Sequence, residues 1–263
     1  MVLARDVARR STTVPANSAV VEITPDSFLQ WLRRRRFALT LTFVLISLGI
    51  VTQQVISSGP LVSLDYRVHY LRFDLRFPQV YDPMYYLVML GQRGPTAIPG
   101  ILLVAVIAGY RRSWRPLLVL GGSLLVLNVV VGVAKVYTAR LKPADGSAAV
   151  FVNGGIIFPS GHASNVVVTW GLVAYLLVAY GPLTRHRAGI VVTTLASLVV
   201  GVTSIYLDTH WITDILAGWL VGIAIVMIAV ALDRRYPAYA PKHRAPTTPR
   251  RTEPERDYAG AVR

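Results

Sequence analysis

The chain contains about six apolar segments, each close to the length that crosses a lipid bilayer, and this pattern limits the fold more than any other feature. A transmembrane helix needs roughly 20 mainly apolar residues to cross a hydrocarbon core about 30 Å thick. Backbone polar groups inside lipid must find partners within the protein, so each segment is expected to be helical. The sequence therefore predicts an all-α, polytopic membrane protein, a bundle of six transmembrane helices. We place these near 37–57, 85–110, 116–134, 163–181, 188–207 and 215–232.

The second segment is the least regular of the six. Gln92 and Arg93 interrupt its start, and Pro95 and Pro99 are expected to kink a helix at this point. We therefore expect this segment to enter the membrane only after Gly94.

Composition and charge exclude several functions. The chain has no cysteine, so disulfides and thiolate metal sites are excluded. The net charge is +14, but the basic residues form short groups beside the apolar segments instead of one patch, so no nucleic-acid partner is expected. By the positive-inside rule, these groups place both termini in the cytoplasm. The groups lie at 33–36, 111–115, 185–187 and 234–235.

Three regions of the chain are distinguished by composition. Residues 33–235 are expected to form the membrane domain, whereas 1–32 and 236–263 mix Pro, Thr, Ala and charges without periodicity. We expect these two ends to be disordered cytoplasmic tails. A compact six-span chain of this kind suits a bacterial plasma (inner) membrane.

The external segment 64–77 alternates aromatic rings with arginines, a mixture typical of contact with lipid headgroups. Two interpretations are open for it: a simple interfacial anchor, or a lid that guides a lipid headgroup. The residues concerned are Tyr66, Arg67, Tyr70, Arg72, Phe73, Arg76 and Phe77.

Residues 159–162 read Pro-Ser-Gly-His at the external start of the fourth segment. Ser160 is expected to cap a helix, and the free backbone N–H groups that follow it favour an anion such as phosphate. Gly161 and the upstream pair at 154–155 are expected to let the backbone approach a ligand closely.

His210 and Asp214 are spaced by one helical turn at the external start of the sixth segment. An aspartate that binds one imidazole nitrogen fixes the tautomer and raises the nucleophilicity of the other nitrogen. Ionisable residues at a membrane helix end can also be inert. Because His162 and Lys135 are expected at the same face, the sequence predicts one polar site there.

These residues resemble the signatures of the type 2 phosphatidic acid phosphatase superfamily, a family of integral-membrane lipid phosphatases. The family signatures are Lys followed after six residues by Arg-Pro, then Pro-Ser-Gly-His, then Ser-Arg followed after five residues by His and after three more by Asp. The second is complete at 159–162, and the His and Asp of the third stand at His210 and Asp214. With the six-span topology, the resemblance covers about residues 35–235, which makes this the expected catalytic domain.

The resemblance implies a role for each matching residue. His210 is the expected nucleophile that forms a phosphohistidine, Asp214 orients it, and His162 protonates the leaving oxygen. The family uses no metal, and no cofactor is expected. The residues expected to hold the phosphate are Lys135, Ser160 and Gly161.

Both signature arginines are replaced in this chain. Lys142 stands where the first signature has arginine, and Ser204 stands where the third has it. Arginine grips two phosphate oxygens at once, whereas lysine is a point charge and serine carries none. Losing one preorganised donor typically costs about 3–4 kcal/mol of transition-state stabilisation.

Either other residues compensate for the two arginines, or the activity has changed. Lys142 itself and Arg140, two residues before it, are candidate phosphate ligands. Arg67, Arg72 and Arg93 also lie on the external side, although such side chains often face solvent or headgroups.

The leading hypothesis is a metal-independent phosphoric monoester or diphosphate hydrolase acting on a membrane lipid. Candidate substrates are a polyprenyl (pyro)phosphate, phosphatidylglycerol phosphate and phosphatidic acid. One alternative is a phosphotransferase that passes a lipid headgroup to an alcohol instead of water. Another is a non-hydrolytic lipid-phosphate binder, or a partner in cell-envelope synthesis, which would not need the trio of His162, His210 and Asp214.

Overall fold

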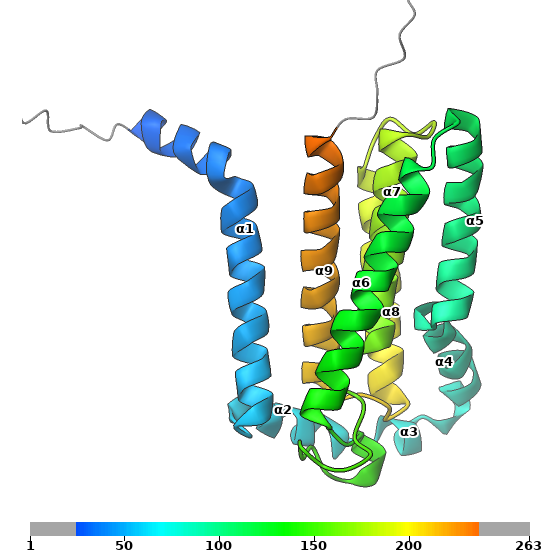
Figure 1. Ribbon diagram of the computed structural model, residues 1–263. Helices are drawn as coiled ribbons and strands as arrows, with labels where there is room; N and C mark the ends of the chain where they lie inside the picture. Colours follow the sequence, from blue (N-terminus) through cyan, green and yellow to red (C-terminus); the bar gives the residue numbers. More distant parts are fainter. Residues whose placement is uncertain (1–24, 237–263) are drawn as a thin grey trace, which may run out of the picture. The chain divides into compact units, whose positions relative to one another are not determined.

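The computed structural model describes residues 25–236, and all regular structure in that range is helical (Figure 1). The chain divides into two units, residues 1–43 and 44–263, and helix α1 (Pro25–Ile56) crosses this division. Helix α1 begins inside the stretch expected to be a tail, since proline is favoured at the first helical position and no glycine or proline follows it until Gly49. The other residues expected to form tails, 1–24 and 237–263, lie outside the described part.

The second unit contains the end of α1, a run of short helices and five long helices. The short ones are α2 (Pro60–His69), α3 (Phe73–Arg76), η1 (Pro78–Val80), α4 (Tyr81–Val88), η2 (Met89–Gly91) and η3 (Pro143–Asp145). The long ones are α5 (Arg93–Arg111), α6 (Arg115–Thr138), α7 (Gly161–Ala179), α8 (Arg187–Tyr206) and α9 (Ile212–Arg235).

Among the described residues, six helices are long and apolar enough to cross a membrane, which confirms the predicted all-α, multi-pass fold. The irregular second segment is resolved into two parts. Residues 85–88 belong to α4, and the membrane-length helix α5 starts only at Arg93, close to the expected Gly94. Pro99 lies within α5 and does not end it.

Helix α7 is the centre of the second unit and contacts α5, α6, α8 and α9. Its Leu172 and Leu176 are fully buried in a core that also includes Leu120 and Leu127 of α6 and Val221 of α9. Because α7 is surrounded in this way, a residue in its first turn is within reach of several other helices.

Two glycines allow α9 to pack closely against α7. A Cβ atom on Gly218 would lie 2.6 Å from the carbonyl oxygen of Ser160, and one on Gly222 would lie 2.8 Å from Cβ of Val167. Small residues at such positions let helix backbones approach each other within a membrane. The contact at Gly218 places the start of α9 beside the start of α7.

Helices α2 and α3 and the loop between α6 and α7 lie at the same end of the long helices (Figure 1). At the opposite end, a second polar cluster around the buried Asp233 connects α9 to α6 and α7. Its carboxylate accepts hydrogen bonds from Nε of Arg115 at 2.7 Å, from Oη of Tyr175 at 2.7 Å and from Oη of Tyr180 at 2.8 Å. The bundle is thus fixed by polar contacts at both ends.

Candidate active site

His162 and His210 face each other where α7 and α9 begin. Ser160 is the N-cap of α7, and its Oγ accepts a hydrogen bond from the backbone N–H of Ala163 at 3.3 Å. His162 is therefore in the first turn of α7, whereas His210 lies in the loop just before α9. The two ring centroids are 6.0 Å apart, at an interplanar angle of 67°. The structure thus brings together the two histidines that the sequence placed at one face.

The carboxylate of Asp214 contacts one imidazole nitrogen of His210. Nδ1 of His210 lies 3.4 Å from Oδ2 of Asp214, and the same oxygen accepts a hydrogen bond from the backbone N–H of Trp211 at 2.9 Å. The backbone N–H of Ser160 also donates to the carbonyl oxygen of Asp214 at 2.9 Å, which joins the two helix starts. With Nδ1 directed at the carboxylate, Nε2 of His210 is the nitrogen left for chemistry.

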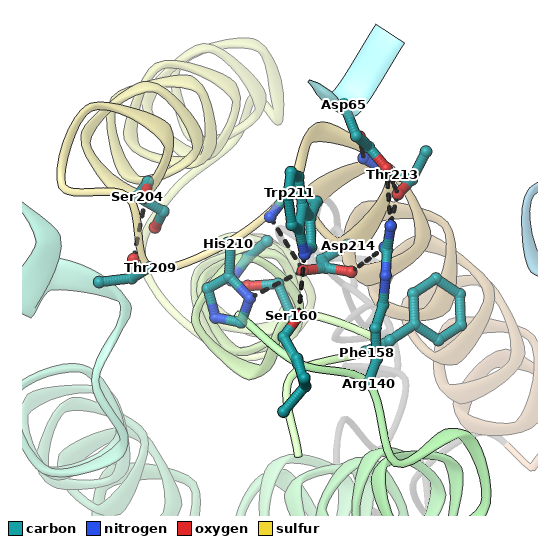
Figure 2. Close-up of polar contacts among 12 residues, drawn as sticks. Asp65, Arg140, Phe158, Ser160, Ser204, Thr209, His210, Trp211, Thr213 and Asp214 are labelled. Carbon is teal, nitrogen blue, oxygen red and sulfur yellow. Dashed lines mark hydrogen bonds and ion pairs between the residues drawn. The ribbon is translucent and has the colours of Figure 1, made fainter. Parts of the chain in front are cut away.

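Arg140 occupies the other side of Asp214, where Figure 2 shows the carboxylate between the guanidinium and the imidazole. Nη1 of Arg140 lies 2.5 Å from Oδ1 of Asp214 and donates to Oγ1 of Thr213 at 2.7 Å. Nη2 donates to Oδ2 of Asp65 at 2.8 Å, and the side chain is fully buried. The role expected for Arg140, binding phosphate, thus finds no support in the geometry: the guanidinium is committed to two carboxylates, as a buried charge requires.

Asp65 of α2 is the site residue that the sequence did not reveal. Its Oδ1 accepts from the backbone N–H of Thr213 at 3.0 Å, and its Oδ2 accepts from Oγ1 of Thr213 at 2.6 Å. Burial raises the pKa of the Asp65 carboxyl, and the hydrogen bond from Thr213 and the charge of Arg140 oppose this rise. The signal in the sequence was weak, because Asp65 is one of two acidic residues in a mainly basic and aromatic segment.

Asp65, Arg140 and Asp214 together determine the net charge beside His210. Two carboxylates, Asp65 and Asp214, and one guanidinium, Arg140, sum to one net negative charge when all are ionised. A negative charge at this position favours a positive imidazole ring over a neutral one.

The segment expected to be an anchor or a lid is attached to the protein through α2. Oη of Tyr66 accepts a hydrogen bond from the backbone N–H of Ala148 at 2.9 Å, and its ring packs edge-on against Trp211 with centroids 5.4 Å apart. Further along, Arg72 is paired with Asp74 at 3.0 Å, while Arg67 is exposed. The α2 side of this segment therefore forms part of the wall of the site.

Lys135 lies in the last turn of α6, on the side of the site where the phosphate is expected. Its Nζ lies 3.9 Å from the point that a Cβ on Gly161 would occupy, so the ammonium group faces the first turn of α7. This placement agrees with the role expected for Lys135.

The two positions that lack the family arginine differ in their surroundings. Lys142 is exposed in the loop after α6. Ser204 is fully buried at the end of α8, where its Oγ donates to the carbonyl oxygen of Val200 at 2.7 Å. The hydroxyl group of Ser204 therefore donates its hydrogen bond within α8.

Gly155 has a different function from the one expected. A Cβ at this position would lie 2.2 Å from the carbonyl oxygen of Ala139, so the glycine allows the loop to pack on the chain itself, beside Arg140. Gly154 next to it has a φ of +86°, a backbone conformation that favours glycine. Gly154 and Gly155 therefore shape the loop that contains Arg140. The packing explains both glycines without a contact to a ligand.

The fold and the site define an all-helical, multi-pass membrane protein with two histidines and a buried aspartate at one end of its helices. Residues 116–236 match the family model described as the PAP2 superfamily. The matched part contains every residue that the sequence assigned to the site. The resemblance to the type 2 phosphatidic acid phosphatases is confirmed.

Two curated relatives are similar over about half of the chain. Phosphatidylglycerophosphatase B of Bacillus subtilis (strain 168) is 29% identical over 148 residues, which cover 54% of this chain and 70% of the relative. An undecaprenyl-diphosphatase of Sulfolobus acidocaldarius is 28% identical over 146 residues, which cover 52% of this chain and 65% of the relative.

A solved structure has the same fold. The crystal structure of a transmembrane PAP2 type phosphatidylglycerolphosphate phosphatase from Bacillus subtilis superposes with a TM-score of 0.64 at 22% identity. The match covers 76% of this chain and 98% of that one, so the fold is shared well beyond the region matched by the family model.

Proposed function

We propose that this protein is a lipid phosphatase that works through a phosphohistidine intermediate. The observation that carries the proposal is the pair of facing rings, His162 and His210, with Asp214 on Nδ1 of His210. Pure binding of a lipid phosphate requires neither a nucleophile with its orienting carboxylate nor a second imidazole beside it. The names of both relatives, a phosphatidylglycerophosphatase and an undecaprenyl-diphosphatase, support the same class of reaction.

In the first step, Nε2 of His210 attacks the phosphorus atom in line with the leaving oxygen. The new N–P bond forms as the P–O bond to the lipid breaks, and His162 gives its proton to the leaving oxygen. The imidazole of His210 becomes positively charged, and the net negative charge of the Asp65, Arg140 and Asp214 group stabilises it.

In the second step, water attacks the phosphohistidine. His162 is neutral after the first step, so it accepts a proton from the water as the new P–O bond forms and the N–P bond breaks. The products are inorganic phosphate and the original state of His210; with a lipid diphosphate, the lipid monophosphate has already left in the first step. Reversing the role of His162 between the two steps restores the site for the next turnover.

The phosphate oxygens are held at the start of α7. Ser160 takes the N–H of Ala163, so the backbone N–H groups of Gly161 and His162 are the ones at this helix end that favour an anion, and Lys135 adds a positive charge beside them. The proposed steps use only side chains and backbone groups of the chain itself, so no metal takes part in them. Independence from metal is part of what the experiment below tests.

The proposed substrate is a membrane lipid with a terminal phosphate or diphosphate. Helices of membrane length end at the site, so a lipid headgroup can reach the histidines while its tail stays in the bilayer. We propose polyprenyl (pyro)phosphate, phosphatidylglycerol phosphate and phosphatidic acid as candidates. The proposed location is a bacterial plasma membrane with both termini cytoplasmic and the site external, in keeping with the basic groups at the other helix ends.

Phosphate release from these three lipids by the detergent-purified protein tests the proposal, with and without a chelator. We expect release that resists the chelator and is lost in His210→Ala. His186→Ala is the matched control, because His186 is exposed at the start of α8 and is far along the chain from the site. Turnover that requires an added alcohol, and that yields a phosphorylated alcohol instead of free phosphate, would establish a phosphotransferase. Binding without any turnover would establish a lipid-phosphate binder.

A further inference from the structure

Ser204 and Lys142 leave the proposed phosphatase without either of the arginines that its family carries, and this inference rests on the proposed function. We propose that Arg93, the first residue of α5, binds the substrate phosphate in their place. The proposal stands on the position of the turn that carries Arg93, on the contacts that fix this turn and on the surroundings of the guanidinium.

The turn before Arg93 is inserted between α7 and α8. A Cβ atom on Gly91 of η2 would lie 2.8 Å from Cβ of His162 and 2.7 Å from Cγ1 of Val200, so only glycine fits here. Val200 is one helical turn from Ser204, whose Oγ donates to its carbonyl oxygen. The turn therefore approaches the site between the catalytic helix α7 and the helix from which the family supplies its arginine.

Asn165 of α7 fixes the same turn. Its Nδ2 donates to the carbonyl oxygen of Gly91 at 3.2 Å and to that of Gln92 at 3.3 Å, while its Oδ1 accepts from Oγ1 of Thr169 at 3.3 Å. Asn165 is buried and lies one helical turn beyond Gly161. The backbone that leads into Arg93 is thus attached directly to the first turns of α7.

The side chain of Arg93 lies on the phosphate side of α7. It lines a small cavity together with Gly161 and Ser164, next to the free N–H groups at the start of the helix. The cavity also reaches α6, because Val131 lines it, and Val131 is one helical turn before Lys135.

The guanidinium N–H groups of Arg93 are also available to a ligand. Arg93 is exposed, and its side chain forms no hydrogen bond or ion pair with any described residue. The other candidates are used elsewhere or lie apart: Arg140 is buried between two carboxylates, and Arg72 is paired with Asp74. Arg67, on α2, lines a separate cavity formed with residues 58–64.

Arg93 and Lys135 supply complementary contacts. Lys135 comes from α6 as a point charge, and Arg93 comes from α5 with a planar fork that fits two phosphate oxygens. Together with the N–H groups of α7, they surround the equatorial oxygens of the phosphoryl group from three helices. This arrangement restores the bidentate contact that position 204 no longer provides.

Phosphate release by Arg93→Ala and Arg93→Lys, compared with wild type, tests the inference. We expect kcat/KM to fall by about a hundred- to a thousandfold in Arg93→Ala, and part of the loss to be recovered in Arg93→Lys. Arg76→Ala is the matched control, since Arg76 is an exposed arginine of α3 outside the cavity. Because Arg93 is exposed, all three variants should unfold at the wild-type temperature.

Release within threefold of wild type by Arg93→Ala would overturn the inference while leaving the phosphatase proposal intact. If the wild type releases no phosphate from any lipid, the proposed function fails by itself. Inorganic phosphate then serves as the probe: weaker binding to Arg93→Ala than to wild type and Arg76→Ala supports Arg93 as a phosphate ligand, and equal binding to all three refutes it.

Discussion

Nη1 of Arg140 lies 2.5 Å from Oδ1 of Asp214, and neither side chain is exposed to solvent. The other carboxylate oxygen of Asp214 faces His210, so the guanidinium and the imidazole share one aspartate. Asp65 binds the second guanidinium nitrogen and offsets the charge of Arg140. The orienting residue of the proposed nucleophile is thereby part of a buried ionic group that reaches α2.

Arg140→Ala removes the only cation between two buried carboxylates. We expect the free energy of unfolding to fall by about 3–5 kcal/mol, because breaking a buried ion pair leaves uncompensated charge. Thermal unfolding in detergent measures this change. Lys142→Ala, two residues further along on an exposed side chain, is the control for stability and should unfold like wild type. An equal unfolding temperature for both variants would refute the structural role of Arg140.

Asp65→Asn keeps the shape of the side chain and removes one charge. The net charge of the buried group then changes from minus one to zero, so the positive His210 ring of the transition state is less stabilised. We expect kcat/KM for phosphate release to fall about tenfold, or ~1.4 kcal/mol. Asp74→Asn, in the exposed pair with Arg72, should retain wild-type activity. A wild-type rate in Asp65→Asn would mean that α2 has no electrostatic effect on the reaction.

His162→Ala should affect substrates according to their leaving group. A general acid typically contributes 10²–10⁴-fold when the leaving oxygen needs a proton. We expect a loss of this order with a lipid phosphate but a much smaller loss with 4-nitrophenyl phosphate, whose phenolate leaves without protonation. Steady-state rates with both substrates test this. Equal losses would assign His162 to phosphate binding instead of proton transfer.

Gly218→Ala adds a Cβ atom 2.6 Å from the carbonyl oxygen of Ser160. Helices α7 and α9 must then separate, and overpacking of this kind costs about 1–3 kcal/mol. We expect a lower unfolding temperature together with reduced phosphate release, because His162 and His210 lie on opposite sides of this contact. Gly121→Ala in α6 is the control: nothing lies within 4 Å of its added Cβ, and alanine favours the helix.

Asn165→Leu removes the amide that holds the turn before Arg93. The carbonyl oxygens of Gly91 and Gln92 lose this partner, at a cost of about 1–3 kcal/mol where they are buried. We expect a fall in kcat/KM comparable to that of Arg93→Ala, although Asn165 is not itself expected to contact phosphate. Ser123→Ala, which removes a hydrogen bond within α6, should keep full activity. Activity in Asn165→Leu well above that of Arg93→Ala would show that the turn holds its position without the amide.

The sequence was sufficient to predict the membrane fold and the meeting of the two histidines, because both depend on local patterns. Segment length sets the helices, and the start of two spans at one face brings His162 and His210 to the same end. The cap at Ser160 follows from its position before Gly161 in the same way. The start of α5 at Arg93 was also readable, since the irregular residues before it interrupt the apolar run.

The surroundings of Asp214 were not predictable, because they depend on pairing between distant parts of the chain. Arg140 and Asp65 are 75 residues apart, and no local pattern indicates that their side chains meet. The direction of a loop arginine is set by what is buried beside it, so Arg140 was assigned to phosphate from its position alone. The packing of Gly155 was not predictable for the same reason: its close neighbour is the backbone of Ala139, which only the folded loop reveals.

The link between Asp65, Arg140 and Asp214 also has a consequence for how the protein is made. The three residues come from the segment after the first span, the loop after the third and the start of the last, so they meet only if all three segments are delivered to the same side of the bilayer. A chain inserted with one span inverted would leave a carboxylate or a guanidinium without its partner at the membrane boundary, which is costly. The ion group beside the proposed nucleophile thereby also favours the chain whose spans are all correctly oriented, and the proposed active site is completed only when the last span is in place.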